Sequence, residues 1–146
     1  MRHERLGENR DRWSTERGSL EIWRRSPEVL VQTLDGHGEA CFVDPMIERL
    51  DAMVAESIKA SVFDDWEKAT RYDPETRSRL TAWTKANRGA LEETVILVRS
   101  KLFAMGVNVA NLAVGGRLKV VSDRCEFETM LADRLGVDPA SLNDVG

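Results

Sequence analysis

The chain has 146 residues, of which 42% are apolar and 32% are charged, and its formal net charge is -4. This length and composition fit one compact soluble domain whose core needs no disulfide framework. With 21 Lys and Arg residues against 25 Asp and Glu residues, the chain lacks the basic excess of general nucleic-acid-binding proteins, and no apolar run reaches the roughly 20 residues of a membrane-spanning helix.

The first 18 residues are dominated by charged side chains, and Leu6 and Trp13 are the only sizeable apolar ones after Met1. Such a segment does not resemble a secretory signal, so we expect a cytoplasmic protein. It also offers too little apolar area to offset the entropy of ordering a chain. We therefore predict that residues 1–18 form an N-terminal arm, disordered unless Trp13 anchors it, and that the folded domain covers residues 19–136.

A β-hairpin is predicted over residues 20–34. A short β-type run with Leu20, Ile22 and Trp23 is followed by the turn sequence Arg25-Ser26-Pro27 and by a second β-type run at residues 29–34. Two short β-type runs separated by turn residues are typical of a hairpin. The turn-forming residues 35–38 are expected to end its second strand.

Two helices are indicated by Asp-Pro pairs, in which Asp can cap free amides and Pro suits the first helical position. Asp44-Pro45 begins a helix with apolar residues at helical spacing up to Val54. Asp73-Pro74 begins a second helix, which is expected to stop near Gly89.

Two strands are predicted, one between these two helices and one after the second helix. Residues 58–63 are β-leaning, and residues 94–98 are an uninterrupted apolar run, as expected for a central strand that is covered on both faces. Asp64 and Asp65 follow the first strand, and adjacent strand residues point to opposite faces. We therefore expect them to be solvated strand ends and not a cation site.

An almost wholly apolar helix is predicted over residues 102–114, with Ser100 as its cap. Because it has hardly any polar face, this helix is expected to be buried or to form an interface.

The last part of the chain adds one strand and one helix. Residues 118–121 form the strand, Asp123 and Glu126 have the spacing of a capping box for a helix, and residues 137–146 form a short polar tail. The order of elements predicts an α/β fold: a single domain with a mixed sheet of about five strands, a β-hairpin at the start and parallel strands joined by right-handed crossover helices.

In open α/β sheets, ligands and partners bind beyond the carboxyl ends of the parallel strands. Ser100 and Lys101, at a helix N-terminus, are the best anion seat at this edge, although capping is the main role expected of Asp73, Ser100 and Asp123. The polar segments at this edge form the predicted docking surface, which consists of Asp65, Trp66, Tyr72, Asp73, Arg99, Ser100, Lys101, Asp123 and Arg124.

Catalytic and metal sites are not indicated. Cys41 and Cys125 are the only cysteines and His3 and His37 the only histidines, so a closed zinc site would need all four or added carboxylates. A serine hydrolase would depend on His37 without a Gly-x-Ser-x-Gly motif, and no Gly-rich nucleotide cradle is present. We expect no enzyme, no metal, no cofactor, and reduced thiols that are buried as small apolar groups.

Four short sequence motifs lie along the chain in the predicted order of elements. They are Asp64-Asp65-Trp66, Thr70-Arg71-Tyr72-Asp73, Leu97-Val98-Arg99-Ser100-Lys101 and Ser122-Asp123-Arg124-x-x-Phe127-Glu128. These motifs and the order of elements resemble the STAS superfamily, whose name joins sulfate transporters to the antagonists of anti-sigma factors. The likeness covers residues 19–135 and is greatest for stand-alone bacterial STAS-like proteins. It implies a noncatalytic regulatory domain that binds a protein partner, such as a regulatory kinase or an anti-sigma-type factor.

The resemblance also implies a phosphorylation switch. In antagonists of anti-sigma factors, a partner kinase phosphorylates a Ser that follows an Asp at the start of a helix. By order, the matching pair here is Asp73-Pro74, which offers no hydroxyl at the second position. Thr76 is the alternative phosphorylation site, where a phosphate would add about two negative charges, although Thr in a first helical turn more often serves local hydrogen bonding.

Two functions fit these observations. The first is a regulatory interaction through the predicted docking surface, with a homodimer through the apolar helix as one arrangement. The second is a carrier for a lipid or another small apolar molecule, with a pocket beside residues 102–114 lined by Trp66, Trp83 and Phe103. Core packing is the usual role of such aromatic side chains.

Overall fold

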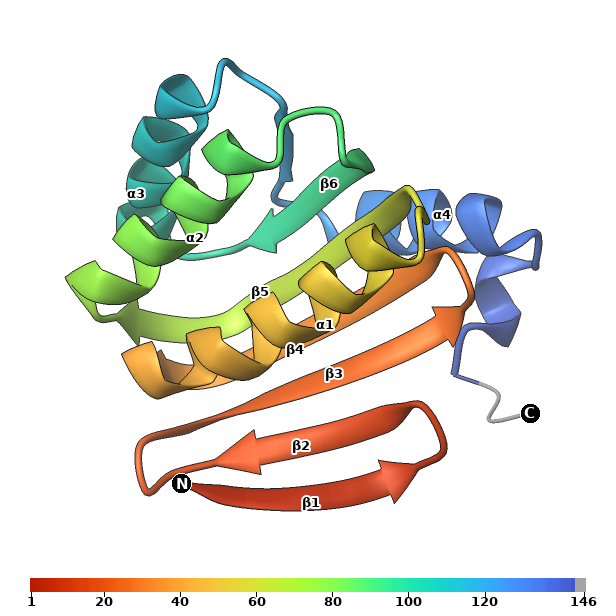
Figure 1. Ribbon diagram of the computed structural model, residues 1–146, viewed down its shortest axis with the longest axis horizontal. Helices are drawn as coiled ribbons and strands as arrows, with labels where there is room; N and C mark the ends of the chain where they lie inside the picture. Colours follow the sequence, from red (N-terminus) through yellow and green to blue (C-terminus); the bar gives the residue numbers. More distant parts are fainter. Residues whose placement is uncertain (144–146) are drawn as a thin grey trace.

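The computed structural model describes residues 1–143, which form one mixed seven-stranded sheet in the order β1-β2-β3-β4-β5-β6-β7 (Figure 1). The strands are β1 (Arg2–Gly7), β2 (Arg10–Ser14), β3 (Gly18–Ser26), β4 (Val29–Gly38), β5 (Ala60–Tyr72), β6 (Leu91–Val98) and β7 (Leu118–Val121). The helices are α1 (Val43–Ala55), α2 (Pro74–Ala86), α3 (Lys101–Ala113) and α4 (Arg124–Leu135), with the short 3-10 helices η1 (Ala40–Phe42) and η2 (Pro139–Ser141).

Strands β1 to β4 pair in antiparallel fashion, and strands β4 to β7 pair in parallel. Helices α1, α2 and α3 connect the parallel strands and cover one face of the sheet, whereas α4 lies on the other face (Figure 1). The predicted α/β class, the hairpin of β3 and β4, and the parallel strands are confirmed. The predicted count of about five strands is too low, because β1 and β2 also belong to the sheet.

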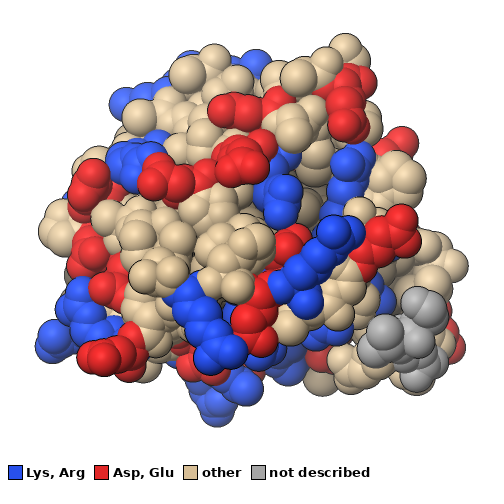
Figure 2. All heavy atoms as spheres, turned by 60° about the horizontal axis from the view of Figure 1, so that its bottom comes forward, with Lys and Arg blue, Asp and Glu red and all other residues tan. Residues whose placement is uncertain are grey.

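The interpretation of residues 1–18 as an arm is wrong, since β1 and β2 extend the sheet next to β3. Arg10 and Arg12 of β2 pair with Glu21 of β3 at 3.2 and 3.3 Å, and Figure 2, in which this edge comes forward, shows side chains of both charges interleaved. Trp13 is buried in the main core, as the alternative in which it anchors this segment predicts. Backbone hydrogen bonds between the strands and cross-strand ion pairs order this segment. A prediction based on the number of apolar residues does not include these interactions.

Each face of the sheet carries its own apolar core. Successive strand residues point to opposite faces, so Val62 and Phe63 of β5 enter different cores. This double burial explains the apolar run of β6, which is paired on both sides as predicted. The core under α1, α2 and α3 includes Leu20, Leu30, Phe42, Val62, Trp66, Trp83, Ile96 and Phe103, and the core under α4 includes Val29, Phe63, Val95, Leu97, Phe127 and Leu131.

The Asp-Pro pairs mark two helices, but neither Asp side chain caps its helix. Helix α1 begins at Val43, so Asp44-Pro45 lies within its first turn. Pro74 is the first residue of α2 as predicted. The preceding Asp73 instead accepts a hydrogen bond from the backbone N–H of Ala40 at 2.9 Å and contacts the ring of His37 at 2.7 Å.

The other two predicted caps are confirmed. Ser100 accepts a hydrogen bond from the backbone N–H of Phe103 at the start of α3, and Asp123 accepts one from the N–H of Cys125 at the start of α4. Cys125 is exposed and Cys41 is partly buried, so the predicted burial is wrong for Cys125. It sits in the first turn of α4.

Two strands are longer than predicted. Strand β5 continues to Tyr72, and β4 continues through Gly38, so residues 35–38 pair with the end of β5 instead of forming a turn. Gly36 has φ of +77°, and a Cβ there would lie 2.6 Å from the carbonyl oxygen of Arg17, which is why this position needs glycine. The extension brings Tyr72 beside Gly38 and over α3.

The predicted polar tail is partly folded. Residues Pro139–Ser141 form η2, and Leu142 is buried in the core under α4. Residues 144–146 of that tail lie outside the described residues. Among residues 1–143, no helix has both the length and the apolar character needed to cross a membrane.

Candidate functional site

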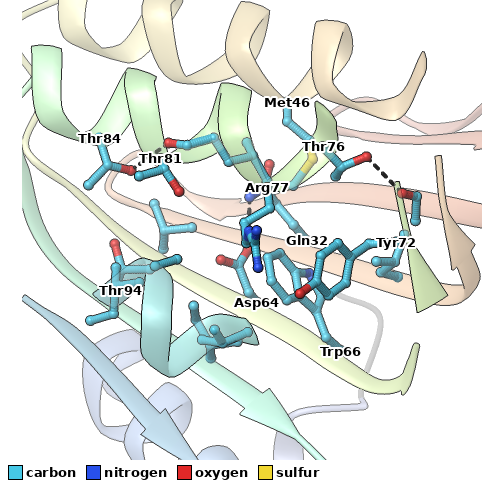
Figure 3. Close-up of a pocket in the computed structure, with 18 of the residues that line it drawn as sticks. Gln32, Met46, Asp64, Trp66, Tyr72, Thr76, Arg77, Thr81, Thr84 and Thr94 are labelled. Carbon is cyan, nitrogen blue, oxygen red and sulfur yellow. Dashed lines mark hydrogen bonds between the residues drawn. The ribbon is translucent and has the colours of Figure 1, made fainter. Parts of the chain in front are cut away.

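A cavity of about 110 Å³ lies between the sheet and helices α1, α2 and α3 (Figure 3). Trp66, Trp83 and Phe103 line this cavity, together with aliphatic side chains from all three helices. It therefore lies beside α3, the helix for which an apolar pocket is predicted.

Two polar side chains form the floor of this cavity. Gln32 of β4 and Asp64 of β5 are register partners in adjacent parallel strands, and the Gln32 Nε2–H donates to Asp64 Oδ1 at 2.8 Å. Only 2% of Gln32 and 5% of Asp64 are exposed. Burial raises the pKa of Asp64 to about 7, whereas the hydrogen bond from Gln32 acts in the opposite direction.

Two side chains that line the cavity each carry a buried polar atom without a hydrogen-bond partner among the described residues: Gln32 Oε1 and Trp66 Nε1. Trp66 is 9% exposed, as is Trp83, but the Trp83 Nε1–H donates to Asp51 at 2.7 Å. Leaving a buried donor or acceptor unpaired costs about 1–3 kcal/mol, so such groups call for an explanation. The third such atom, Arg10 Nε, lies elsewhere, in a guanidinium that already binds Glu21.

Tyr72 and Arg77 lie at the mouth of the cavity. The Arg77 guanidinium is 6.0 Å from the centre of the Tyr72 ring, and that ring meets Phe103 edge-on at 4.7 Å. These three residues and Gly106 also line a second, outer hollow between α2 and α3. They therefore form the partition between the cavity and the surface.

Gly106 allows this partition to close. A Cβ at this position would lie only 1.8 Å from the Tyr72 hydroxyl oxygen. The glycine therefore lets the tyrosine ring rest directly on the backbone of α3.

The predicted docking surface is divided between the two faces of the sheet. Strands β5, β6 and β7 do run side by side in the same direction, as expected. Trp66 and Tyr72, however, face α3, whereas Asp65 faces α4 and binds Arg124. The pleat separates neighbouring residues of β5 in this way, and most polar members of the surface already have partners within the chain.

Arg124 is the most heavily engaged of these residues. Its guanidinium donates to both oxygens of Asp65 at 2.7 and 2.8 Å and to Glu67 at 2.9 Å, and it also contacts Glu128 at 3.4 Å. This network ties α4 to β5. Arg99 and Lys101 remain exposed at the start of α3.

Asp73 and Thr76 support the loop that leads to α1. Hydrogen bonds from His37 and from the backbone of Ala40 lower the pKa of Asp73. Thr76 is buried, and its hydroxyl donates to the carbonyl oxygen of Gly38 at 2.8 Å. A kinase would have to break this contact to reach the hydroxyl.

Gln32, Asp64, Arg77 and Gly106 are not among the predicted site residues. A signal for the first two was present: Gln32 interrupts an apolar run in β4, and Asp64 alternates with Val62 and Trp66 on one face of β5. Within residues 1–143, no group of three His, Cys, Asp or Glu side chains is arranged to hold a metal ion.

No protein-family model matches the sequence, and no curated protein matches it either.

Proposed function

We propose that this protein binds a small, mainly apolar molecule in the cavity between the sheet and helices α1, α2 and α3. The observation that carries this proposal is the pair of unpartnered buried atoms, Gln32 Oε1 and Trp66 Nε1, on side chains that line a mainly apolar cavity. A core selected only for stability would fill these positions with apolar side chains. Apolar walls with a few fixed polar groups are typical of small-molecule sites.

The volume limits the size of the ligand. An engineered apolar cavity of about 150 Å³ holds benzene, and this cavity measures about 110 Å³. Because this cavity is smaller than that one, a molecule of about six or seven non-hydrogen atoms fits only when the walls adjust around it. Its effect would come from occupancy, which rigidifies α2 and α3 against the sheet, and not from chemistry.

Filling the cavity is expected to abolish ligand binding. Ala110 of α3 lines the cavity, whereas Ala113 is exposed on the same helix. In a thermal-unfolding assay, toluene at ten times its Kd should stabilise the wild type and Ala113→Leu by about 1.4 kcal/mol, and it should not stabilise Ala110→Leu. If neither toluene nor phenol shifts the unfolding of the wild type, the proposal is wrong.

A second candidate function is self-association through α3, because this helix presents an apolar stripe. The side chains are spaced three and four residues apart on one face, and an apolar stripe of this kind is typical of an interaction surface. The stripe consists of Leu102, Met105, Val109 and Leu112, which are 59% to 81% exposed. The regulatory interaction implied by the STAS resemblance stays a prediction.

Charge on this stripe is expected to prevent the self-association. Sedimentation velocity over a concentration series should show a monomer–dimer equilibrium for the wild type and a monomer for Leu112→Glu. Ser78→Glu adds the same charge to the exposed surface of α2 and should behave like the wild type. A wild-type chain that sediments as a monomer at every concentration would exclude this candidate.

A further inference from the structure

We infer that the ligand of this cavity carries a hydroxyl group on its apolar body, and that this hydroxyl donates to Gln32 Oε1 and accepts from Trp66 Nε1. The inference rests on the proposed function and specifies the ligand class. It follows from what the two unpartnered atoms can do and from where the fold places them.

The orientation of the Gln32 amide is set by Asp64. Above its pKa of about 7, Asp64 is ionised and can only accept hydrogen bonds, so the amide turns its Nε2–H towards Asp64 Oδ1. The Gln32 carbonyl oxygen is left as a buried acceptor without a partner in the part of the chain that the structure describes. A ligand that pairs with this oxygen must therefore offer a hydrogen-bond donor.

The Trp66 indole provides the complementary group. Its Nε1–H can only donate, and the ring is held by the edge-on contact with Phe103 at 5.8 Å between centroids. Trp66 follows Asp64 by two residues on β5, so the two side chains share one face of the sheet. Figure 3 shows Gln32, Asp64 and Trp66 together on the sheet side of the cavity.

The unpaired acceptor Gln32 Oε1 and the unpaired donor Trp66 Nε1 limit which polar group the ligand can carry. A hydroxyl both donates and accepts through a single atom, so it can satisfy both partners in a small space. A ketone or ether has no donor for Gln32, and an ammonium group has no acceptor for Trp66. A carboxylate only accepts and would bring a second negative charge next to Asp64.

The comparison of phenol with toluene tests this inference, because the two molecules have nearly the same size and differ in the hydroxyl. Calorimetric titration at pH 8 should give a Kd at least tenfold lower for phenol than for toluene with the wild type. Trp66→Phe removes the N–H and Gln32→Met removes the acceptor. In each variant the Kd of toluene should be less than threefold higher than that of phenol. The Kd of toluene also shows whether the substitution has changed the size of the cavity.

The possible results separate the two proposals. Equal Kd values for phenol and toluene with the wild type would overturn the hydroxyl assignment and leave the binding function standing. A phenol preference that survives in both variants would also overturn it, because the hydroxyl would then bind elsewhere. Absence of binding by both molecules would overturn the proposed function itself.

Discussion

The Asp64→Asn variant is expected to lose less stability than the wild type when the pH rises from 5 to 8. Between these two pH values, the wild type should lose roughly 2–3 kcal/mol more of its free energy of unfolding than the variant, since one pKa unit corresponds to about 1.4 kcal/mol. Guanidinium unfolding at both pH values measures this difference.

The sign follows from the buried position of Asp64. Its pKa in the folded protein is raised from 3.8 to about 7 by burial, so the folded state binds this proton more tightly than the unfolded state. Stability is therefore highest below the unfolded pKa and falls as the pH rises through the folded pKa. The charged groups that line the rim, Glu39 and Arg77, make no hydrogen bond with Asp64 within residues 1–143.

Asp35→Asn is the matched control for this experiment. Asp35 lies on the neighbouring strand β4 and is exposed, so its replacement should leave the pH dependence of the wild type unchanged. An Asp64→Asn variant with the full wild-type pH dependence would show that Asp64 is not buried beneath the cavity.

Phe103→Ala is expected to cause the largest loss of stability, about 3–5 kcal/mol, as for other large-to-small changes in cores. Phe103 is buried and holds both Trp66 and Tyr72 in place through edge-on ring contacts. Its removal deletes these contacts and enlarges the cavity. Toluene should therefore restore more stability to this variant than to the wild type, as measured by denaturant unfolding with and without toluene.

Asn108→Ala on the same helix provides the comparison, since Asn108 is exposed and is not part of the apolar stripe, and its replacement should change stability by less than about 0.5 kcal/mol. If Phe103→Ala does not fold, Phe103→Leu should show the same effects with smaller amplitude. A loss below about 1 kcal/mol for Phe103→Ala would contradict the packing described for the partition.

Much of the helical structure was predictable because its signals are local. Pro74 at the first position of α2, and the caps Ser100 and Asp123, follow from side chains that act on backbone groups within three residues. The Asp73 side chain was misassigned, because its partners, His37 and Ala40, lie more than thirty residues away. Sequence patterns contain no direct information on such distant pairing.

Strand boundaries and the first two strands were harder to predict. Positions 67–72 at the end of β5 are polar except for Ala69, and most residues of β1 and β2 are charged. These segments become strands because a neighbouring strand pairs with their backbone. Ion pairs such as Arg12–Glu21 form only when that pairing has set the register.

The sequence alone determined the α/β class, the order of helices after the hairpin and the apolar character of α3, since hydrophobic periodicity and turn residues act over short distances. Only the tertiary structure decided that Gln32, Asp64 and Trp66 meet under three helices, while Asp65 turns away to Arg124. The reason is physical: strand register selects the neighbours across the sheet, and the pleat sends successive side chains to opposite faces.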